Sequence, residues 1–255
     1  MRKRLMRHAR PWLVAIGILL IWEIGCRVAS VPSFVLPRPI QVMAAMFEFR
    51  EALLSNSLHT LFTTMIGFAI AVAVGILLGA AVGTSTAVYE AIYPTLIAFN
   101  AIPKVALVPV IVIWCGIGTL PAIITAATLA FFPIVVNVAT GLATVEPELR
   151  DVLRSLGATR YESLSKVGIP RSLPYLFASL KIAVTLAFIG SVIAETVAAN
   201  SGIGFLMMSA ASNFEVPLVF AGLIVLAIMS VIIYLLCSAL ERRTTGWAFR
   251  GQLVS

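Results

Sequence analysis

The sequence predicts an all-α membrane protein with six transmembrane helices, and three observations lead to this fold class. Hydrophobic residues make up 60% of the 255 residues and charged residues only 11%, whereas soluble domains average roughly 45–50% and about 25%. The apolar residues gather in windows of about 20, the length that a helix needs to cross a bilayer. Lys and Arg are concentrated in the segments between these windows. An ordinary soluble domain is therefore excluded.

Six windows have the length and hydropathy of a span. They are Pro11–Val28, Thr60–Gly83, Ile92–Trp114, Leu120–Leu142, Leu173–Ala198 and Pro217–Leu240. The first follows a basic N-terminus, as in a signal peptide, but Glu23 interrupts its apolar run and no small-residue cleavage site follows. We therefore expect an uncleaved first span. The third window is the least regular, because Pro94, Pro103, Lys104 and Pro109 interrupt it.

Lys and Arg also predict the orientation of the spans. With six spans, the N-terminus, the segment after the fourth span and the C-terminus lie on one side of the membrane. Their basic residues are Arg2, Lys3, Arg4, Arg7, Arg10, Arg150, Arg154, Arg160, Lys166, Arg171, Arg242, Arg243 and Arg250. The other side has only Arg27, Arg38 and Arg50. Cytoplasmic loops carry the excess of Lys and Arg, so both termini are expected in the cytoplasm. The net charge of +7 is thus a topology signal, and no nucleic-acid partner is expected.

We expect one transmembrane domain over residues 1–255. Its parts are the first span with an outer helix (1–59), the core spans (60–240), a cytoplasmic segment within them (143–172) and a cytoplasmic tail (241–255). The outer helix is predicted over Pro39–Asn56. Its apolar positions are Ile40, Met43, Ala44, Phe47 and Leu54. Such an amphipathic helix would either lie on the outer membrane face or cover the mouth of the bundle.

Small residues recur at every fourth position of the second span. They are Gly67, Ala71, Gly75, Gly79 and Gly83. Small residues at this spacing let two helix backbones approach closely. We expect the last three glycines to pack against another helix, either within the chain or across a subunit interface.

The segment after the fourth span combines positive charge with helical periodicity. Its first short helix has one apolar face, made by Leu149, Val152, Leu153 and Leu156, at the spacing of a helix. Gly157 ends this helix, because glycine tolerates positive φ.

A second short helix is expected to follow. Thr159 and Glu162 fit the capping box that begins a helix. We expect this helix to stop at Gly168 and Pro170, with Pro174 in the first turn of the fifth span.

The turn between the two short helices would present Leu156, Ala158 and Tyr161 at its tip. An amphipathic segment resting on lipid remains an alternative. A surface helix needs no tight turn, however, so the favoured interpretation is a tip that inserts into a groove on a partner protein.

The spacing within this segment resembles a known signature. Asp151-Val152-Leu153 is followed after three residues by Gly157, and nine residues later by Val167-Gly168-Ile169-Pro170. Binding-protein-dependent ABC importer permeases have Glu-Ala-Ala, three residues, Gly, nine residues and Ile-x-Leu-Pro on their cytoplasmic side. Here Asp replaces Glu and Val-Leu replaces Ala-Ala, while Gly157, Pro170 and the spacing are kept.

Three further segments resemble the nitrate, sulfonate and taurine branch of these permeases. They are Leu36–Pro39, Ala101–Pro109 followed by Trp114–Gly118, and Ala194–Thr196 with Ser201–Phe205. The likeness covers nearly the whole chain in order.

The resemblance implies a MetI-like permease fold with six spans in the bacterial inner membrane. The charged hairpin would be a coupling helix that docks into a cleft on a cytoplasmic ATPase. Its expected coupling residues are Asp151, Arg154, Leu156, Gly157, Ala158, Thr159, Tyr161 and Pro170. The implied partners are two ATPase subunits, a second permease copy and an extracytoplasmic solute-binding protein. A homodimer is expected, because one set of six spans is too small to enclose a path, and a heterodimer remains open.

We expect no enzymatic activity and no cofactor on this chain. The phosphate-loop motif G-x-x-x-x-G-K-[ST] does not occur in the sequence, so ATP and Mg²⁺ would bind to the partner ATPase. His8 and His59 are far apart, and no Cys/His cluster has the spacing of a metal site. No catalytic residue is therefore expected.

Polar residues within the spans are functional candidates, because burying them in lipid is costly. The candidates for the translocation path are Lys104, Asn137, Glu195 and Asn200, with Asn100 raising the same question. Lys104 lines the pore or makes a cytoplasmic contact. Glu195 forms either a structural hydrogen bond or part of an outer gate. Glu23 and Lys181 are expected to extend toward the membrane surface.

The predicted function is the permease subunit of an ATP-driven importer. The solute is expected to be a small anion such as a sulfonate, taurine or nitrate. A pyrimidine-type vitamin precursor or an aromatic acid is the alternative, because the binding protein largely selects the ligand. A self-sufficient secondary transporter would show midplane charge pairs and an internal repeat, and neither is clear here. A membrane enzyme lacks candidate residues.

Overall fold

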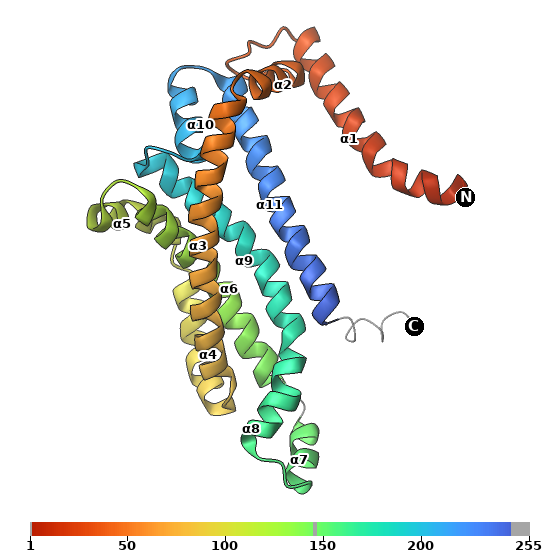
Figure 1. Cartoon of the computed structure of the whole chain (residues 1–255), viewed down its shortest axis with the longest axis vertical. Coiled ribbons are helices and arrows are strands. Elements are labelled where there is room, and N and C mark those ends of the chain that lie inside the picture. The colour runs from red at the N-terminus through yellow and green to blue at the C-terminus, as the bar shows by residue number, and fades with distance from the viewer. Residues whose placement is uncertain (1, 145–146, 246–255) are drawn as a thin grey trace.

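The computed structural model describes residues 2–144 and 147–245, and these fold almost entirely into helices (Figure 1). The elements are α1 (Arg2–Val28), α2 (Pro39–Glu48), α3 (Arg50–Gly83), α4 (Thr86–Asn100), η1 (Lys104–Leu107), α5 (Val108–Cys115), α6 (Thr119–Ala143), α7 (Pro147–Ser155), α8 (Arg160–Ser163), η2 (Leu164–Gly168), α9 (Ile169–Ala198), α10 (Ile203–Ser212) and α11 (Val216–Thr244). The predicted all-α class is confirmed.

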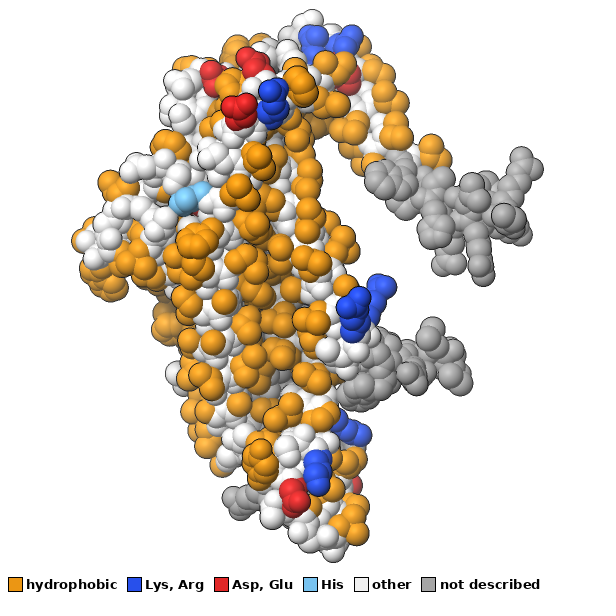
Figure 2. Space-filling view, in the orientation of Figure 1, with side chains coloured by type: hydrophobic (Ala, Val, Ile, Leu, Met, Phe, Trp, Pro, Cys, Tyr) orange, Lys and Arg blue, Asp and Glu red, His pale blue; other side chains and the backbone are white. Residues whose placement is uncertain are grey.

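Four of the predicted windows coincide with long apolar helices. α3, α6, α9 and α11 are each long and apolar enough to cross a membrane. Apolar side chains cover the middle of the molecule in Figure 2, while charged side chains gather at its upper end and in its lower part. For the first window, α1 is helical, but the side chains of residues 1–12 lie outside the described part. A count of six spans therefore remains a prediction.

The third predicted window is not one straight span. It divides into α4 and, after a break, η1 with α5. The helix axis bends by 69° between these two halves. Pro103 lies in the break, where a proline cannot donate the hydrogen bond that a helix needs. The bend moves Lys104 to the start of a new helical segment.

The core forms where α3, α6 and α9 run side by side (Figure 1). The glycine stripe of α3 lies directly on α6 within the same chain. A Cβ added to Gly75 would lie 2.7 Å from Cβ of Ile134, and one added to Gly79 would lie 2.7 Å from Cβ of Val138. At Gly83 the nearest atom would be the Ala139 carbonyl oxygen at 2.6 Å. Packing of this kind needs no hydrophobic effect between helices, only close backbone approach.

The predicted outer helix over Pro39–Asn56 is wrong in extent. α2 ends at Glu48, and Phe49 leaves the helical conformation (φ −97°, ψ 22°) before α3 begins at Arg50. Val42 and Ala45 are the buried face of α2, and Val42 packs in a cluster with residues of α3, α10 and α11. The apolar residues used for the prediction, such as Met43 and Phe47, point outward. α2 therefore covers the end of the bundle with one face and leaves an apolar face exposed.

α10 (Ile203–Ser212) was not predicted from the sequence. This ten-residue helix lies between α9 and α11 at the end of the molecule that carries α2 (Figure 1). Its buried residues Ile203 and Ala210 pack with Leu218 and Ala221 of α11. A helix of this length is too short to span a bilayer.

Candidate functional site

The charged hairpin projects from the end of the molecule opposite α2 and α10 (Figure 1). α7 ends in a Schellman motif, in which the Ala158 N–H donates to the Leu153 carbonyl oxygen at 2.9 Å. Gly157 has φ +79°, as predicted for the turn. A Cβ at Gly157 would meet nothing within 4 Å. The backbone conformation, and not lack of space, therefore demands glycine here.

The second half of the hairpin begins with the predicted capping box. The Glu162 N–H donates to Thr159 Oγ1 at 3.2 Å, and the Thr159 N–H donates to Glu162 Oε2 at 2.9 Å. Both ends of the turn are thus fixed by local hydrogen bonds. The tip has a defined shape without a partner.

The two large apolar side chains of the tip are exposed. Leu156 is 77% exposed and Tyr161 78% exposed, while Ala158 is half-buried. On α7, Val152 is exposed and Leu153 is half-buried. The predicted coupling residues Asp151 and Arg154 belong to α7, but their side chains lie outside the described part of the chain.

The second short helix does not stop where it was predicted to stop. It continues through the π-helical segment η2 into α9, so that one helix runs from Tyr161 to Ala198. The Ile169 N–H bonds to the Leu164 carbonyl oxygen, five residues back, and this wider turn precedes Pro170 at the start of α9. Pro174 lies inside α9 and not in its first turn. A π-helical turn lets the helix pass the proline, which lacks the N–H donor of an α-helix.

Two of the candidate path residues, Lys104 and Asn137, line one groove. The groove has a volume of about 450 Å³ and lies between the broken pair α4/η1, α6 and α9. Its lining includes Asn100, Lys104, Phe132, Asn137, Ile182 and Leu186.

Lys104 is held in position within this groove. Its Nζ donates to Asn100 Oδ1 at 2.7 Å and lies 5.2 Å from the centre of the Phe132 ring, within the range of a cation–π contact. Asn137 Nδ2 donates to the Pro133 carbonyl oxygen at 2.8 Å. The groove is thus mainly apolar, with one ammonium group and two amides.

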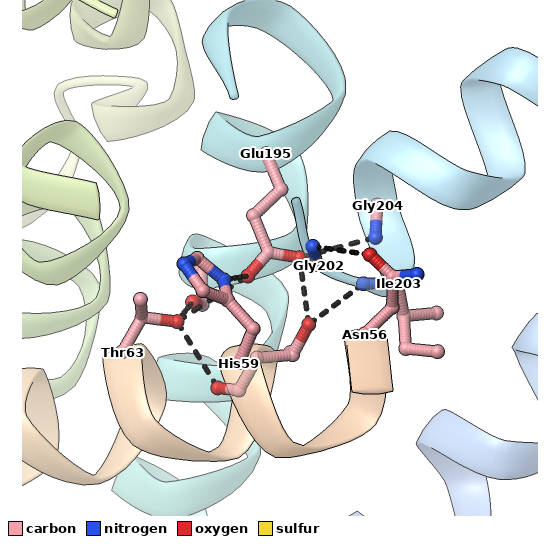
Figure 3. A network of polar contacts seen from close by, with 9 residues as sticks. Asn56, His59, Thr63, Glu195, Gly202, Ile203 and Gly204 are labelled. Carbon is pink, nitrogen blue, oxygen red and sulfur yellow. Dashed lines mark hydrogen bonds and ion pairs between the residues drawn. The ribbon is translucent and has the colours of Figure 1, made fainter. Parts of the chain in front are cut away.

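The other two candidate path residues lie elsewhere. Asn200 is exposed in the connection between α9 and α10. Glu195 is 1% exposed and lies in a polar network between α3, α9 and the start of α10 (Figure 3). Neither residue lines the groove of Lys104.

The carboxylate of Glu195 accepts hydrogen bonds from two other elements. Thr60 Oγ1 donates to its Oε2 at 2.8 Å, and Thr63 Oγ1 lies 3.3 Å from its Oε1. The Gly204 N–H, in the first turn of α10, donates to Oε2 at 3.1 Å. His59 Nδ1 lies 3.9 Å from Oε1. Glu195 therefore joins α9 to α3 and to α10, as Figure 3 shows.

Sequence reasoning missed Asn56 and Thr60. Asn56, Thr60 and Thr63 share one face of α3 at helical spacing, and Gly202 and Gly204 follow in a segment already noted for its resemblance. Polar residues at helical spacing within an apolar span were the available signal.

Lys181 does not extend alone toward the membrane surface. Its Nζ pairs with Glu241 Oε2 at 2.8 Å, linking α9 to α11. Glu23 accepts from Arg27 Nε at 2.6 Å and from the Ile40 N–H at 3.3 Å, which links α1 to α2. Within the described residues, no group of three or more His, Cys, Asp and Glu residues could hold a metal ion.

Comparisons with known proteins agree over most of the chain. Residues 71–246 match the family model described as "Binding-protein-dependent transport system inner membrane component". The chain is 32% identical to the formylaminopyrimidine transport permease protein ThiX of Halalkalibacterium halodurans, over 96% of this chain and 98% of that protein. It is 34% identical to the riboflavin transport system permease protein RibX of Chloroflexus aurantiacus, over 90% of this chain and 87% of RibX.

One further relative and one solved structure are also similar to this chain. The putative aliphatic sulfonates transport permease protein SsuC of Escherichia coli is 30% identical, over 96% of this chain and 94% of that protein. The fold is similar to that of a chain of the MetNI methionine ABC transporter in an inward-facing conformation, with a TM-score of 0.58. That chain is 20% identical, and the match covers 78% of this chain and 97% of that one. At this identity the structural likeness concerns the fold alone.

Proposed function

The chain belongs to the family of binding-protein-dependent transport system inner membrane components, the permease subunits of ABC importers, and we propose that it imports a small organic or inorganic anion. It is a multi-pass inner-membrane protein of MetI-like fold. In importers of this family ATP is hydrolysed by a separate ATPase subunit, and an extracytoplasmic binding protein delivers the solute.

The projecting hairpin is the observation that carries the coupling part of the proposal. Its tip exposes Leu156 and Tyr161, and the Schellman motif and the capping box fix its shape before any partner binds. A preformed apolar tip binds a cleft at a lower entropic cost than a flexible loop. The hairpin therefore docks into a cytoplasmic ATPase, with residues of α7 and α8 in contact.

The hairpin and its role imply the orientation and the assembly. The hairpin lies in the cytoplasm together with both termini, and α2 and α10 lie at the outer face. Two ATPases bind two permease copies, one hairpin each. Ile113 and Trp114 of α5 are exposed, and in a homodimer the second copy covers such residues of the broken helix and closes the path.

The groove of Lys104 supports an anionic solute. Lys104 is positively charged, and none of the described residues that line the groove is acidic. In an apolar surrounding, a fixed positive charge attracts an anion far more strongly than it does in water. Lys104, Asn100 and Asn137 are therefore the proposed contacts for a sulfonate, taurine or nitrate group during passage.

A heteroaromatic vitamin precursor is the second candidate solute. Two of the relatives carry the names of formylaminopyrimidine and riboflavin permeases. The groove also offers two amides and the ring of Phe132, groups that bind a flat heterocycle by hydrogen bonds and stacking. The charge of Lys104 distinguishes the two candidates, because a neutral heterocycle does not require it.

Uptake into vesicles tests the proposed function. The chain is reconstituted with its ATPase and binding protein, and labelled taurine, nitrate and a formylaminopyrimidine are supplied with ATP or with ADP. Uptake that requires ATP supports the importer. Solute movement by the chain alone, driven by a gradient without ATP, would show a secondary transporter instead.

A further inference from the structure

Three consecutive backbone N–H groups at the start of α10 are bound by side chains of other helices. The Gly202 N–H donates to Asn56 Oδ1 at 2.8 Å, and the Ile203 N–H donates to Thr60 Oγ1 at 2.8 Å. The Gly204 N–H donates to Glu195 Oε2 at 3.1 Å. We call Asn56, Thr60 and Glu195 the α10 anchor. α10 has no N-cap side chain of its own, so the anchor supplies the acceptors that a helix start requires.

Thr60 links the Ile203 N–H to Glu195 in one chain of hydrogen bonds. Its hydroxyl has a single hydrogen, which it donates to Glu195 Oε2 at 2.8 Å, and its oxygen accepts the Ile203 N–H. The carboxylate at the end of this chain also lies at the N-terminal, partly positive end of the α10 dipole. All three anchor groups therefore bind α10 only while α3 and α9 keep their present relative position.

The backbone at the start of α10 lies so close to Glu195 that a side chain larger than glycine does not fit at Gly202 or Gly204. A Cβ on Gly202 would overlap the carboxyl group of Glu195, and one on Gly204 would lie 2.7 Å from Cβ of Glu195. Gly202 also has φ +104°, a conformation that favours glycine. The start of α10 is thus held against α9 by direct backbone contact as well as by hydrogen bonds.

Glu195 stands on the same helix as the hairpin tip. The helix from Tyr161 to Ala198 is continuous, and its rise of 1.5 Å per residue places Glu195 about 50 Å from Tyr161. Tyr161 of the hairpin and Glu195 of the anchor therefore lie near the two ends of one helix. A continuous helix is a physical connection through which a displacement of the hairpin can reach Glu195.

We propose that the α10 anchor makes α10 a mechanically driven gate, with Glu195 and Thr60 as the positioning residues that transmit the movement of the hairpin to it. The inference rests on the proposed function, because it takes the ATPase to move the hairpin. When α9 shifts against α3, Glu195 and the pair Asn56 and Thr60 no longer hold the same three N–H groups, and α10 is repositioned at the outer face.

The test measures solute imported per ATP hydrolysed by the reconstituted full importer. The variants are Glu195→Gln, which keeps the shape but removes one acceptor oxygen, and Thr60→Val, which keeps the shape but removes the hydroxyl. We expect the ratio to fall about tenfold in Thr60→Val, the factor that corresponds to one lost hydrogen bond to a charged group. The fall is smaller in Glu195→Gln, because Thr60 and Gly204 donate to the same carboxylate oxygen and the amide oxygen of Gln still accepts from both. ATP hydrolysis continues, because the hairpin still moves.

Two matched variants separate this role from general loss of structure. Thr60→Ser keeps the hydroxyl and should retain the wild-type ratio. Ser179→Ala removes an equally buried hydroxyl of α9 that bonds only within its own helix, to the Leu176 carbonyl oxygen, and should also retain it. If Glu195→Gln fails to assemble, the comparison of Thr60→Val with Thr60→Ser decides.

The outcomes are distinct. An unchanged ratio in Thr60→Val, with only the yield of assembled importer reduced, would contradict the gate role of α10. It would not contradict the proposed importer function. An equal fall in Ser179→Ala would also contradict the gate role of α10. If the wild-type importer shows no ATP-dependent uptake, the proposed function itself fails, and the inference fails with it.

Discussion

Thr60 and Glu195 lie 135 residues apart in the sequence, yet the Thr60 hydroxyl donates to the Glu195 carboxylate at 2.8 Å. The bond crosses from α3 to α9 in a region where both residues are buried. In so apolar a surrounding a buried carboxylate is costly unless donors surround it. The network therefore stabilises the end of the bundle that carries α10, as well as positioning α10.

Removal of the Glu195 carboxylate should destabilise the protein. Glu195→Ala leaves the Gly204 N–H and the Thr60 hydroxyl without their acceptor, and we expect a loss on the order of 3 kcal/mol in the free energy of unfolding. Glu195→Gln retains one acceptor oxygen and should lose less. Thermal unfolding in detergent measures the difference, with Ser179→Ala as the control. Equal unfolding temperatures for Glu195→Ala, Glu195→Gln and Ser179→Ala would show that the hydrogen bonds to Glu195 do not stabilise the protein.

Substitution in the glycine stripe should separate α3 from α6. In Gly79→Val the new side chain meets Val138, whose Cβ would lie 2.7 Å from the added Cβ. Overpacking of this kind costs about 1–3 kcal/mol. We expect a lower yield of folded protein by size-exclusion chromatography. Gly25→Ala, where nothing lies within 4 Å of the added Cβ, serves as the control and should leave the yield unchanged.

The effects of substituting Lys181 and Glu241 on stability should depend on each other. Both are mostly shielded from solvent, so Lys181→Ala leaves a buried carboxylate unpaired, at a cost of about 3 kcal/mol or more. The double variant Lys181→Ala with Glu241→Ala should be more stable than Lys181→Ala alone. A double-mutant cycle of unfolding temperatures measures the coupling. Additive effects of the two changes would show that the ion pair contributes nothing.

Lys104→Gln should distinguish the two candidate solutes. Loss of the ammonium removes the positive charge of the groove, so import of an anion should fall about tenfold or more. Import of a neutral heterocycle should change little. The measurement is uptake of each labelled solute at equal amounts of assembled importer. Undiminished anion import by this variant would place the anion's path away from Lys104.

Much of the architecture follows from local sequence features. The long apolar windows predict α3, α6, α9 and α11, because a span must satisfy its backbone hydrogen bonds internally. The hairpin turn is also local, since Gly157 supplies the positive φ and Thr159 and Glu162 are only three residues apart. Such features depend on neighbouring residues and can be recognised without a fold.

The remaining features depend on contacts between distant residues. The N–H groups at the start of α10 bind acceptors on Asn56 and Glu195, which belong to other helices. The residues around the start of α10 therefore do not predict how it is held. Lys181 pairs with Glu241, sixty residues away. In the sequence Lys181 is an isolated charge within an apolar span, so the ion pair could not be predicted. The continuous passage of the helix through Pro170 depends on a π-helical turn that no composition rule predicts.

Retention of the ATPase by the purified chain tests the central claim most directly. The tagged chain is purified together with its ATPase, and Gly157→Val is compared with Gly116→Val. Both glycines have φ near +80° and empty space around an added Cβ, but Gly116 follows α5, far from the hairpin (Figure 1). A β-branched residue is strained at this φ, so Gly157→Val distorts the tip. The account predicts that wild type and Gly116→Val retain the ATPase and that Gly157→Val loses it. Full retention by Gly157→Val, or loss by both variants alike, would contradict the hairpin as the docking element.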